Sequence, residues 1–212
     1  MTTTCPLCLA AALEAFAEIA PRRYLHCCAC DVVVLDPGQL PTPAEERAEY
    51  ALHRNDPGDP RYRRHLAQLT EPLTAGLPPG AEGLDFGCGP GPAVSAMLAE
   101  REFRMADYDP FFRPDRVALA ATYDFIACTE AAEHFHRPAR EFALLARLLR
   151  PGGRLGIMTQ LRTEAVDFGK WWYTRERSHV TFYSPETMRW IAARHGWSCR
   201  ILGDRIALFG RG

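Results

Sequence analysis

The chain is nearly devoid of lysine and carries almost no net charge. Lys170 is the only lysine among its 212 residues, and the 25 basic side chains nearly balance the 26 acidic ones. Both charge signs are mixed along the sequence, so no block of it offers the basic surface that a large polyanion requires. The composition therefore disfavours nucleic acid as a partner.

The sequence also lacks an apolar run of the roughly 20 residues needed to cross a bilayer. Residues 1–5 have neither the basic start nor the apolar core of a secretory signal. We therefore expect a protein of the cytoplasm with no membrane partner, long enough for one domain and a small appendage. Thiols stay reduced in that compartment, so paired cysteines indicate metal binding or packing before disulfides.

Two C-x-x-C pairs stand near the N-terminus, separated by a gap of ribbon-like length. Four thiolates in this two-plus-two spacing are typical of a tetrahedral structural Zn²⁺ site. Residues 1–38 are too short to build a core, so the metal would supply the folding energy of a zinc-ribbon-like module. A closed site has no open coordination position, so we expect no catalytic role for this metal. The predicted ligands are Cys5, Cys8, Cys27 and Cys30.

Two alternatives remain open for this module. Cys28 and His26 are spare donors that leave the ligand set uncertain. The alternative to a zinc site is a set of reduced, packing cysteines in a site that has lost its metal. A redox function is disfavoured because neither pair opens a helix after a strand. The alanine-rich stretch between the pairs has the spacing of a helix, with one face formed by Leu13, Phe16 and Ala17.

Residues 39–80 are expected to form two linking helices. Thr42 is a suitable N-cap for the first, and apolar residues recur at helical spacing over residues 61–74 in the second. A turn of alternate glycines then follows a short apolar strand that ends near Phe86. Glycine suits such a turn because a positive φ and a close ligand both exclude a Cβ atom. Pro92 follows, at the first turn of a helix.

The pattern Asp85-x-Gly87-x-Gly89-x-Gly91 resembles motif I of the class I S-adenosylmethionine (SAM)-dependent methyltransferases. A dinucleotide fingerprint would place its third glycine one residue later, which disfavours an NAD-dependent oxidoreductase. Three later segments resemble the same family in the expected order: the acidic strand end at 107–110, the strand and Glu-His pair at 123–134, and the Pro-Gly-Gly turn at 149–155.

This resemblance implies an α/β fold over residues 81–212, a Rossmann-like methyltransferase sheet with an antiparallel last strand. The domains are then 1–38, 39–80 and 81–212. Only residues 113–122 lie between the second strand and the next, so we expect the family's third strand to be shortened or missing. A final helix is expected to begin after Ser184 and to be followed by two strands.

The resemblance also implies SAM as the cofactor. Asp109 would accept both ribose hydroxyls, since a carboxylate offers two acceptors in one plane. Asp107 is the alternative, because it would share a strand face with Asp109. The cofactor-binding set is Asp85, Gly87, Cys88, Gly89, Gly91, Asp109, Pro110, Thr129 and Glu130. In this family the segment before motif I covers the SAM pocket. Tyr50, His53 and Tyr62 are therefore candidate lid residues, and ordinary packing is the alternative for each.

An aromatic-rich stretch over residues 163–183 follows the fifth strand, where the family builds its substrate pocket. It resembles a branch that methylates quinones, sugars and other small molecules, although packing is an equal explanation for its tryptophans. The expected acceptor-side residues are Glu133, Trp172, Tyr173 and Tyr183. His134 and His179 are the candidate general bases, because histidine titrates near neutral pH; proximity and desolvation alone are the alternative.

The predicted function is therefore SAM-dependent methylation of a small-molecule acceptor. A non-catalytic SAM-binding or SAM-sensing protein, with the zinc ribbon as an adaptor, is the alternative. Neither the acceptor atom nor the oligomeric state follows from the sequence.

Overall fold

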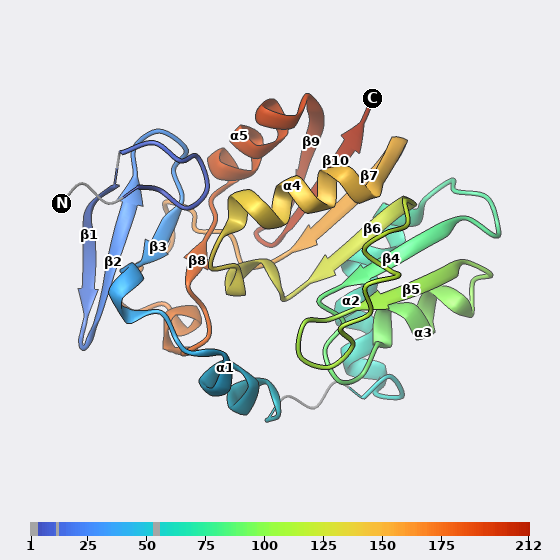
Figure 1. Ribbon diagram of the computed structural model, residues 1–212, viewed down its shortest axis with the longest axis horizontal. Coiled ribbons are helices and arrows are strands. Elements are labelled where there is room, and N and C mark those ends of the chain that lie inside the picture. Colours follow the sequence, from blue (N-terminus) through green and yellow to red (C-terminus); the bar gives the residue numbers. More distant parts are fainter. Residues whose placement is uncertain (1–3, 12, 53–55) are drawn as a thin grey trace.

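A six-stranded sheet with the order β5-β4-β6-β7-β10-β9 lies at the centre of the protein. Figure 1 shows the computed structural model, which describes residues 4–11, 13–52 and 56–212. β4, β5, β6 and β7 are parallel, and β10 runs antiparallel to both β7 and β9. This confirms the predicted α/β sheet with its antiparallel last strand. The strands are β4 (Glu82–Phe86), β5 (Arg104–Tyr108), β6 (Tyr123–Thr129), β7 (Leu149–Met158), β9 (Trp197–Leu202) and β10 (Ile206–Arg211).

The predicted loss of a third strand is also confirmed. The described chain between β5 and β6 forms only an isolated bridge between Asp109 and Arg113. β5 is consequently the edge strand, and the loop after it returns directly to β6.

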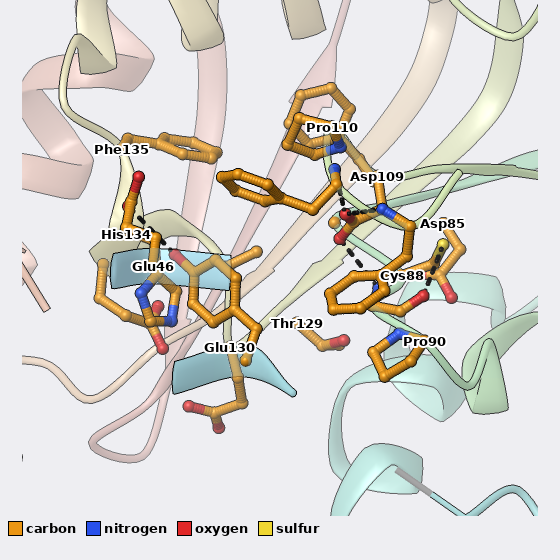
Figure 2. A pocket seen from close by; sticks show the side chains of 18 of the residues that line it. Glu46, Asp85, Cys88, Pro90, Asp109, Pro110, Thr129, Glu130, His134 and Phe135 are labelled. Carbon is orange, nitrogen blue, oxygen red and sulfur yellow. Dashed lines mark hydrogen bonds between the residues drawn. The ribbon is translucent and has the colours of Figure 1, made fainter. Parts of the chain in front are cut away.

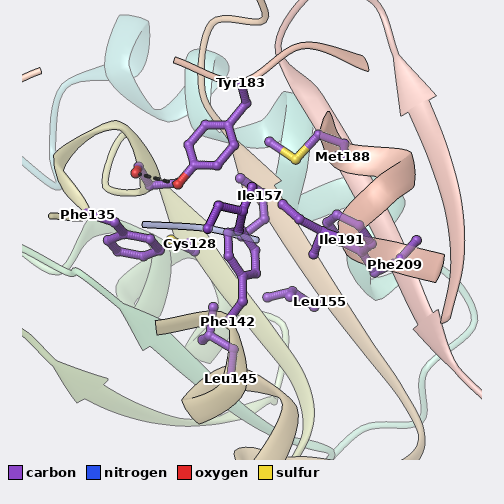
Figure 3. Close-up of a cluster of buried hydrophobic side chains, with 14 of the residues drawn as sticks. Cys128, Phe135, Phe142, Leu145, Leu155, Ile157, Tyr183, Met188, Ile191 and Phe209 are labelled. Atoms are coloured by element: carbon purple, nitrogen blue, oxygen red, sulfur yellow. Dashed lines mark hydrogen bonds between the residues drawn. The ribbon is translucent and has the colours of Figure 1, made fainter. Parts of the chain in front are cut away.

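Helices cover both faces of the sheet (Figure 1). α2 (Pro60–Thr74) and α3 (Ala93–Ala99) lie on one face, and α4 (Pro138–Leu148) and α5 (Pro185–His195) lie on the other. Alternate side chains of β6 enter the two cores, as the pleat requires. Figure 3 shows the α4/α5 side, where Phe142, Met188 and Ile191 pack on Ile157 and Phe209.

The ends of α5 follow the sequence signals. The Ser184 hydroxyl accepts the backbone N–H of Thr187 at 3.0 Å, and Pro185 occupies the first helical turn. Gly196 ends the helix with a φ of 69°, a conformation that favours glycine.

A second sheet, with the order β1-β2-β3-β8, contains the N-terminal module. Its strands are β1 (Leu13–Ile19), β2 (Arg22–Cys27), β3 (Val33–Leu35) and β8 (Thr181–Phe182). β8 comes from the segment after β7, so two distant parts of the chain share one sheet (Figure 1).

The predicted helical face of Leu13, Phe16 and Ala17 is wrong, because these residues lie on strand β1. β1 and β2 form an antiparallel hairpin in which Leu13 pairs with Cys27. A hairpin returns the chain to its starting point and so brings the two cysteine pairs together. A helix of the same length would instead separate them by about 1.5 Å for each residue.

Two helices link the module to the sheet. α1 (Pro43–Tyr50) begins with a capping box, in which the Thr42 hydroxyl accepts the Glu45 N–H while the Glu45 carboxylate accepts the Thr42 N–H. α2 follows after the breakers of residues 56–59. None of the helices in the described ranges has the length and apolar character needed to span a bilayer.

Candidate functional site

A cavity of about 550 Å³ opens at the carboxyl ends of β4, β5 and β6, where α/β sheets bind their ligands. Figure 2 shows Asp85, Cys88 and Asp109 at one end of it and Glu46 and His134 at the other. We call these the cofactor end and the acceptor end. The segment after β7 and helix α1 contribute the acceptor end, and the glycine turn after β4 contributes the cofactor end.

The glycine turn depends on the absence of side chains. Gly87 has a φ of 82°, and a Cβ atom there would lie 2.6 Å from the Cβ of Ala131. The Gly87 N–H donates to the Tyr108 carbonyl at 2.8 Å, which fixes the turn to the end of β5. Gly89 also has a positive φ, of 63°. Substituting either glycine would therefore strain the backbone that faces the cavity.

Asp109 organises the loop beside this turn. Its Oδ1 accepts the N–H groups of Phe111 and Phe112 at 2.8 and 3.0 Å, and its Oδ2 accepts the Gly89 N–H at 3.0 Å. A carboxylate has about four lone-pair positions, so three of them are already used. Both ribose hydroxyls can bind here only if one of these backbone bonds yields.

Asp107, the alternative ribose acid, faces elsewhere. Its Oδ1 accepts the Ser95 hydroxyl, and its Oδ2 lies 3.7 Å from Nη1 of Arg113. Asp109 is a lining residue of the cavity, whereas Asp107 is absent from the lining within the described chain.

Asp85 is the most deeply buried acid at the cofactor end. Burial raises the pKa of its carboxyl to about 8, and the negative charge of Asp107 adds to the effect. Its Oδ1 finds no hydrogen-bond partner in the part of the chain that the structure describes. The side chain is therefore poised to receive a cationic or hydrogen-donating group from a ligand.

All nine predicted cofactor-binding residues line the cavity. Thr129, the last residue of β6, and Glu130, which follows it, lie where the two ends meet. Glu130 has a φ of 48°, which is uncommon for a residue with a side chain. Its Oε1 lies 3.1 Å from Nε2 of His65 on α2.

Three predicted residues gather at the acceptor end. Glu133, His134 and His179 each offer one ligand atom, and these atoms lie within 4.8 Å of one another. Glu133 is fully buried, and burial, followed by the charge of Glu130, raises the pKa of its carboxyl well above the ordinary value. The rings of His134 and His179 meet edge to face, with centroids 4.9 Å apart.

The predicted aromatic residues of this end take different positions. Trp172 and Tyr173 line the cavity; Trp172 is half exposed, whereas Tyr173 is buried. The Tyr173 hydroxyl lies 3.0 Å from Oγ1 of Thr159. Burial raises the pKa of Tyr173 well above the ordinary value. Tyr183 is not brought to the cavity lining of the described chain. It is fully buried in the core and donates to the Ala132 carbonyl at 3.0 Å.

Helix α1 covers the acceptor end. The Tyr50 ring lies between Phe111 and His134, with centroid distances of 5.5 and 5.0 Å. Tyr62 of α2 also lines the cavity, and burial together with the charge of Asp85 raises its pKa to about 12. His53, the third predicted lid residue, lies outside the described residues.

Sequence reasoning missed several lining residues, among them Glu46 and His136 at this end. The Glu46 carboxylate accepts the Tyr50 hydroxyl at 3.2 Å, and its Oε1 lies 3.0 Å from Nε2 of His136. Glu46 belongs to no motif. Only the structure singles it out, because Glu46 is a buried acid on an otherwise exposed helix, and buried acids are uncommon.

Arg22 of the N-terminal hairpin fixes the segment that carries His179. Its guanidinium donates to the carbonyl oxygens of Thr174, Glu176 and His179 at 3.1, 2.9 and 2.6 Å. A fourth bond reaches the Arg177 carbonyl at 3.3 Å. The acceptor end is therefore built against the N-terminal module.

The four predicted cysteine ligands also come together. Sγ of Cys5 lies 3.7 Å from Sγ of Cys30, and Sγ of Cys8 lies 3.4 Å from Sγ of Cys27. Zn–S bonds of about 2.3 Å place tetrahedral sulfur atoms about 3.8 Å apart, so the arrangement fits a zinc ion. Cys28 is exposed and outside the cluster.

The two cysteine pairs have the same backbone geometry. The N–H groups of Leu9 and Asp31 donate to the carbonyls of Cys5 and Cys27 at 3.0 and 2.8 Å. Leu9 and Asp31 each follow the second cysteine of a pair and have positive φ values of 65° and 61°. A hydrogen bond from Cys30 is the main cause that lowers the pKa of Cys5 to about 5.

A family model described as a methyltransferase domain matches residues 59–200. Among the curated proteins, the sequence has no match. Solved structures do resemble it. A 1,6-didemethyltoxoflavin-N1-methyltransferase from Burkholderia thailandensis, with bound 1,6-didemethyltoxoflavin and S-adenosylhomocysteine, has 18% identity and a TM-score of 0.56, with 93% of this chain and 97% of that chain covered.

Two further structures show the same fold. An O-methyltransferase family protein from Burkholderia thailandensis has 15% identity and a TM-score of 0.54, with 78% of this chain covered. The present chain spans only 62% of that protein's length. A SAM-dependent methyltransferase from Archaeoglobus fulgidus has 14% identity and a TM-score of 0.52, with 70% of this chain and 92% of that chain covered.

Proposed function

This chain belongs to the methyltransferase-domain family, and on that premise we propose that it transfers a methyl group from SAM to a small-molecule acceptor. The observation that carries the proposal is the single cavity that joins the glycine turn to the cluster of Glu133, His134 and His179. Cofactor and acceptor would meet inside one pocket, near Thr129. The Burkholderia enzyme that holds S-adenosylhomocysteine together with its acceptor supports such an arrangement.

The glycine turn, with Asp85 and Asp109, would hold the cofactor. Asp109 would accept ribose hydroxyls once one of its backbone hydrogen bonds yields, and Oδ1 of Asp85, which has no hydrogen-bond partner among the described residues, suits the cofactor's ammonium group. Pro110 and its neighbours Phe111 and Phe112 offer apolar surface for the adenine. The remaining lining residues of this end are Gly87, Cys88, Gly89, Gly91, Thr129 and Glu130.

Methyl transfer needs alignment more than it needs protein chemistry, because the sulfonium is already activated. A lone pair of the acceptor forms a bond to the methyl carbon while the carbon–sulfur bond breaks, and sulfur keeps that electron pair. If the acceptor is a hydroxyl or amine, its proton must also leave. His134 and His179 would be the general bases that take this proton, and Glu133, Trp172 and Tyr173 would form the wall beside the acceptor.

We propose in addition that Cys5, Cys8, Cys27 and Cys30 hold a structural Zn²⁺. The repeated backbone geometry of the two pairs and the fitting sulfur separations support this. The ion would fix the hairpin whose Arg22 positions the acceptor end. A cytoplasmic location, in which these thiols stay reduced, is part of the same proposal.

Calorimetry with S-adenosylhomocysteine, followed by a panel of small acceptors with radiolabelled SAM, tests the function. Binding together with transfer to at least one acceptor is expected. Tight binding without any transfer would favour the SAM-sensing alternative. Absence of binding would contradict the cofactor assignment altogether.

A further inference from the structure

Glu133 is buried in a way that is costly without a counter-charge. Its side chain has no exposed surface, and neither carboxylate oxygen has a partner at hydrogen-bond distance within the described ranges; the hydroxyls of Tyr173 and Thr159 only partly offset the burial that raises its pKa. Burying a carboxyl group without such partners is unfavourable even in its neutral form. An acid of this kind in a cavity wall points to a ligand that is absent from the bare chain.

The two neighbouring histidines present the matching nitrogen atoms. Nδ1 of His134 lies 3.0 Å from the Ser178 carbonyl oxygen, and Nδ1 of His179 lies 2.8 Å from the Tyr173 carbonyl oxygen. A carbonyl only accepts, so each Nδ1 must carry the proton. In each neutral ring the lone pair then lies on Nε2, and Nε2 of His179 lies 4.0 Å from Oε1 of Glu133.

This pattern is the one that metal-binding histidines show, since the nitrogen that does not bind the metal usually donates to a carbonyl or carboxylate. The carbonyls are themselves held in place. Ser178 and Tyr173 belong to the segment that Arg22 fixes through the carbonyls of Thr174, Glu176 and His179. The ring orientations are therefore set before any ligand arrives.

We infer that Glu133, His134 and His179 form a binding site for a divalent transition-metal ion at the acceptor end of the cavity. Their ligand atoms lie within 4.8 Å of one another. Bonds of about 2.0–2.2 Å to a tetrahedral or octahedral ion place neighbouring ligand atoms about 3.0–3.4 Å apart, so the side chains must close in by up to about 1.5 Å on binding. Glu130 lies outside the set because its carboxylate is paired with His65.

Two histidines and one carboxylate leave coordination positions open toward the cavity. This inference rests on the proposed function for its purpose: an oxygen-bearing acceptor, most suitably with two neighbouring oxygen atoms, would fill those positions. A bound cation lowers the pKa of a hydroxyl, so the acceptor can release its proton to water before the methyl group is transferred to the resulting oxyanion. His134 and His179 would then act as ligands rather than as general bases.

Mn²⁺ is a suitable probe, because it prefers oxygen and nitrogen ligands to thiolates and so avoids the four-cysteine site. We expect about one bound Mn²⁺ per chain in electron paramagnetic resonance titrations of the full-length protein. Glu133→Gln, His134→Ala and His179→Ala should each weaken Mn²⁺ binding by roughly 10- to 100-fold. His136→Ala is the matched control: it lines the same cavity outside the cluster and should leave the Mn²⁺ affinity unchanged.

Binding of S-adenosylhomocysteine is measured on the same variants. It distinguishes the proposed metal site from the proposed methyltransferase function, and it also shows whether each variant is folded. Variants that bind it normally and lose Mn²⁺ support the metal site. Wild-type protein that binds it but takes up no Mn²⁺, or a Glu133→Gln protein that keeps its Mn²⁺ affinity, overturns the metal site and leaves the methyltransferase proposal standing. Wild-type protein that binds Mn²⁺ through the cluster without binding S-adenosylhomocysteine would refute the methyltransferase proposal alone.

Discussion

The two ends of the cavity are built in different ways. The cofactor end comes from the turns directly after β4 and β5, and its shape is set by backbone: glycine dihedrals, a Gly87–Tyr108 bond and three N–H groups on Asp109. The acceptor end is assembled from helix α1, the loop after β6 and the segment after β7. That segment is in turn held by Arg22 of the N-terminal hairpin.

This difference suggests that the cofactor end is the part that related folds can share and that the acceptor end is the part that can differ between them. A cofactor end made of backbone can recur wherever the strand and glycine turn recur. An acceptor end made of long-range contacts can change its shape with each insertion and appendage. The N-terminal module is therefore best understood as the support of the acceptor end, because β8 completes its sheet and Tyr24 packs with Phe168 and Phe182.

The largest expected effect comes from removing a cysteine ligand. Cys8→Ser should reduce zinc from about one ion per chain to near zero by metal analysis. Structural zinc contributes roughly 10–16 kcal/mol in small zinc modules, so the hairpin and residues 170–183 should lose protection in hydrogen exchange. The cofactor end is fixed by hydrogen bonds among the turns after β4 and β5, so S-adenosylhomocysteine should still bind within a few-fold of the wild-type affinity.

Cys28→Ser is the control for that experiment, because Cys28 is exposed and outside the cluster. It should keep both the zinc and the protection. A fully folded Cys8→Ser protein that never contained zinc would contradict the metal assignment. Equal loss at both ends of the cavity would contradict the division between them.

A smaller effect, confined to the cofactor end, is expected from Asp109→Ala. The substitution removes the proposed ribose contact and the acceptor of three backbone N–H groups. Hydrogen bonds to a charged group contribute about 1.5–3 kcal/mol, so calorimetry should show S-adenosylhomocysteine affinity lower by roughly 10- to 150-fold. Asp107→Ala should change the affinity for S-adenosylhomocysteine far less, because the Asp107 carboxylate binds the Ser95 hydroxyl instead. A larger loss of affinity in Asp107→Ala than in Asp109→Ala would assign the ribose contact to Asp107.

The same division explains how much of the molecule the sequence predicted. The strands of the central sheet and the capped helix α5 follow from local signals, since Gly, Pro and N-cap residues act within a few positions of themselves. The missing third strand and the nine cofactor-binding residues were implied by the resemblance to the family, and all nine reached the cavity. Their individual roles remain predictions, as do the domain boundaries 1–38, 39–80 and 81–212.

Predictions that depended on distant contacts were less successful. The alanine-rich stretch was expected to be helical, but the meeting of two cysteine pairs imposes a hairpin. Tyr183 has the same aromatic character as Tyr173, yet the pairing of β8 with β3 sends it into the core. Glu46 and His136 are far apart in sequence, and only the packing of α1 over the loop after β6 joins them.

The smallest expected effect is a pH dependence at the cofactor end. Asp85 has a pKa raised to about 8 in the folded chain, against an ordinary 3.8, so it is neutral at pH 6 and increasingly charged toward pH 8. A ligand ammonium favours the charged form, so S-adenosylhomocysteine affinity should rise between pH 6 and 8, by at most about tenfold per pH unit. Calorimetry at several pH values measures this rise.

Stability should change in the opposite direction. Between pH 4 and 8 the folded protein holds a proton on Asp85 that the unfolded chain has lost, so raising the pH favours unfolding. The contribution of this side chain is complete below pH 4 and is lost as the pH rises through about 8. Asp85→Asn removes both dependences, whereas Asp107→Asn removes a neighbouring charge and should only shift the midpoint downward. An affinity that is flat with pH in the wild-type protein would mean that the ligand's ammonium does not approach Asp85, and the cofactor end would then rest on Asp109 and the glycine turn alone.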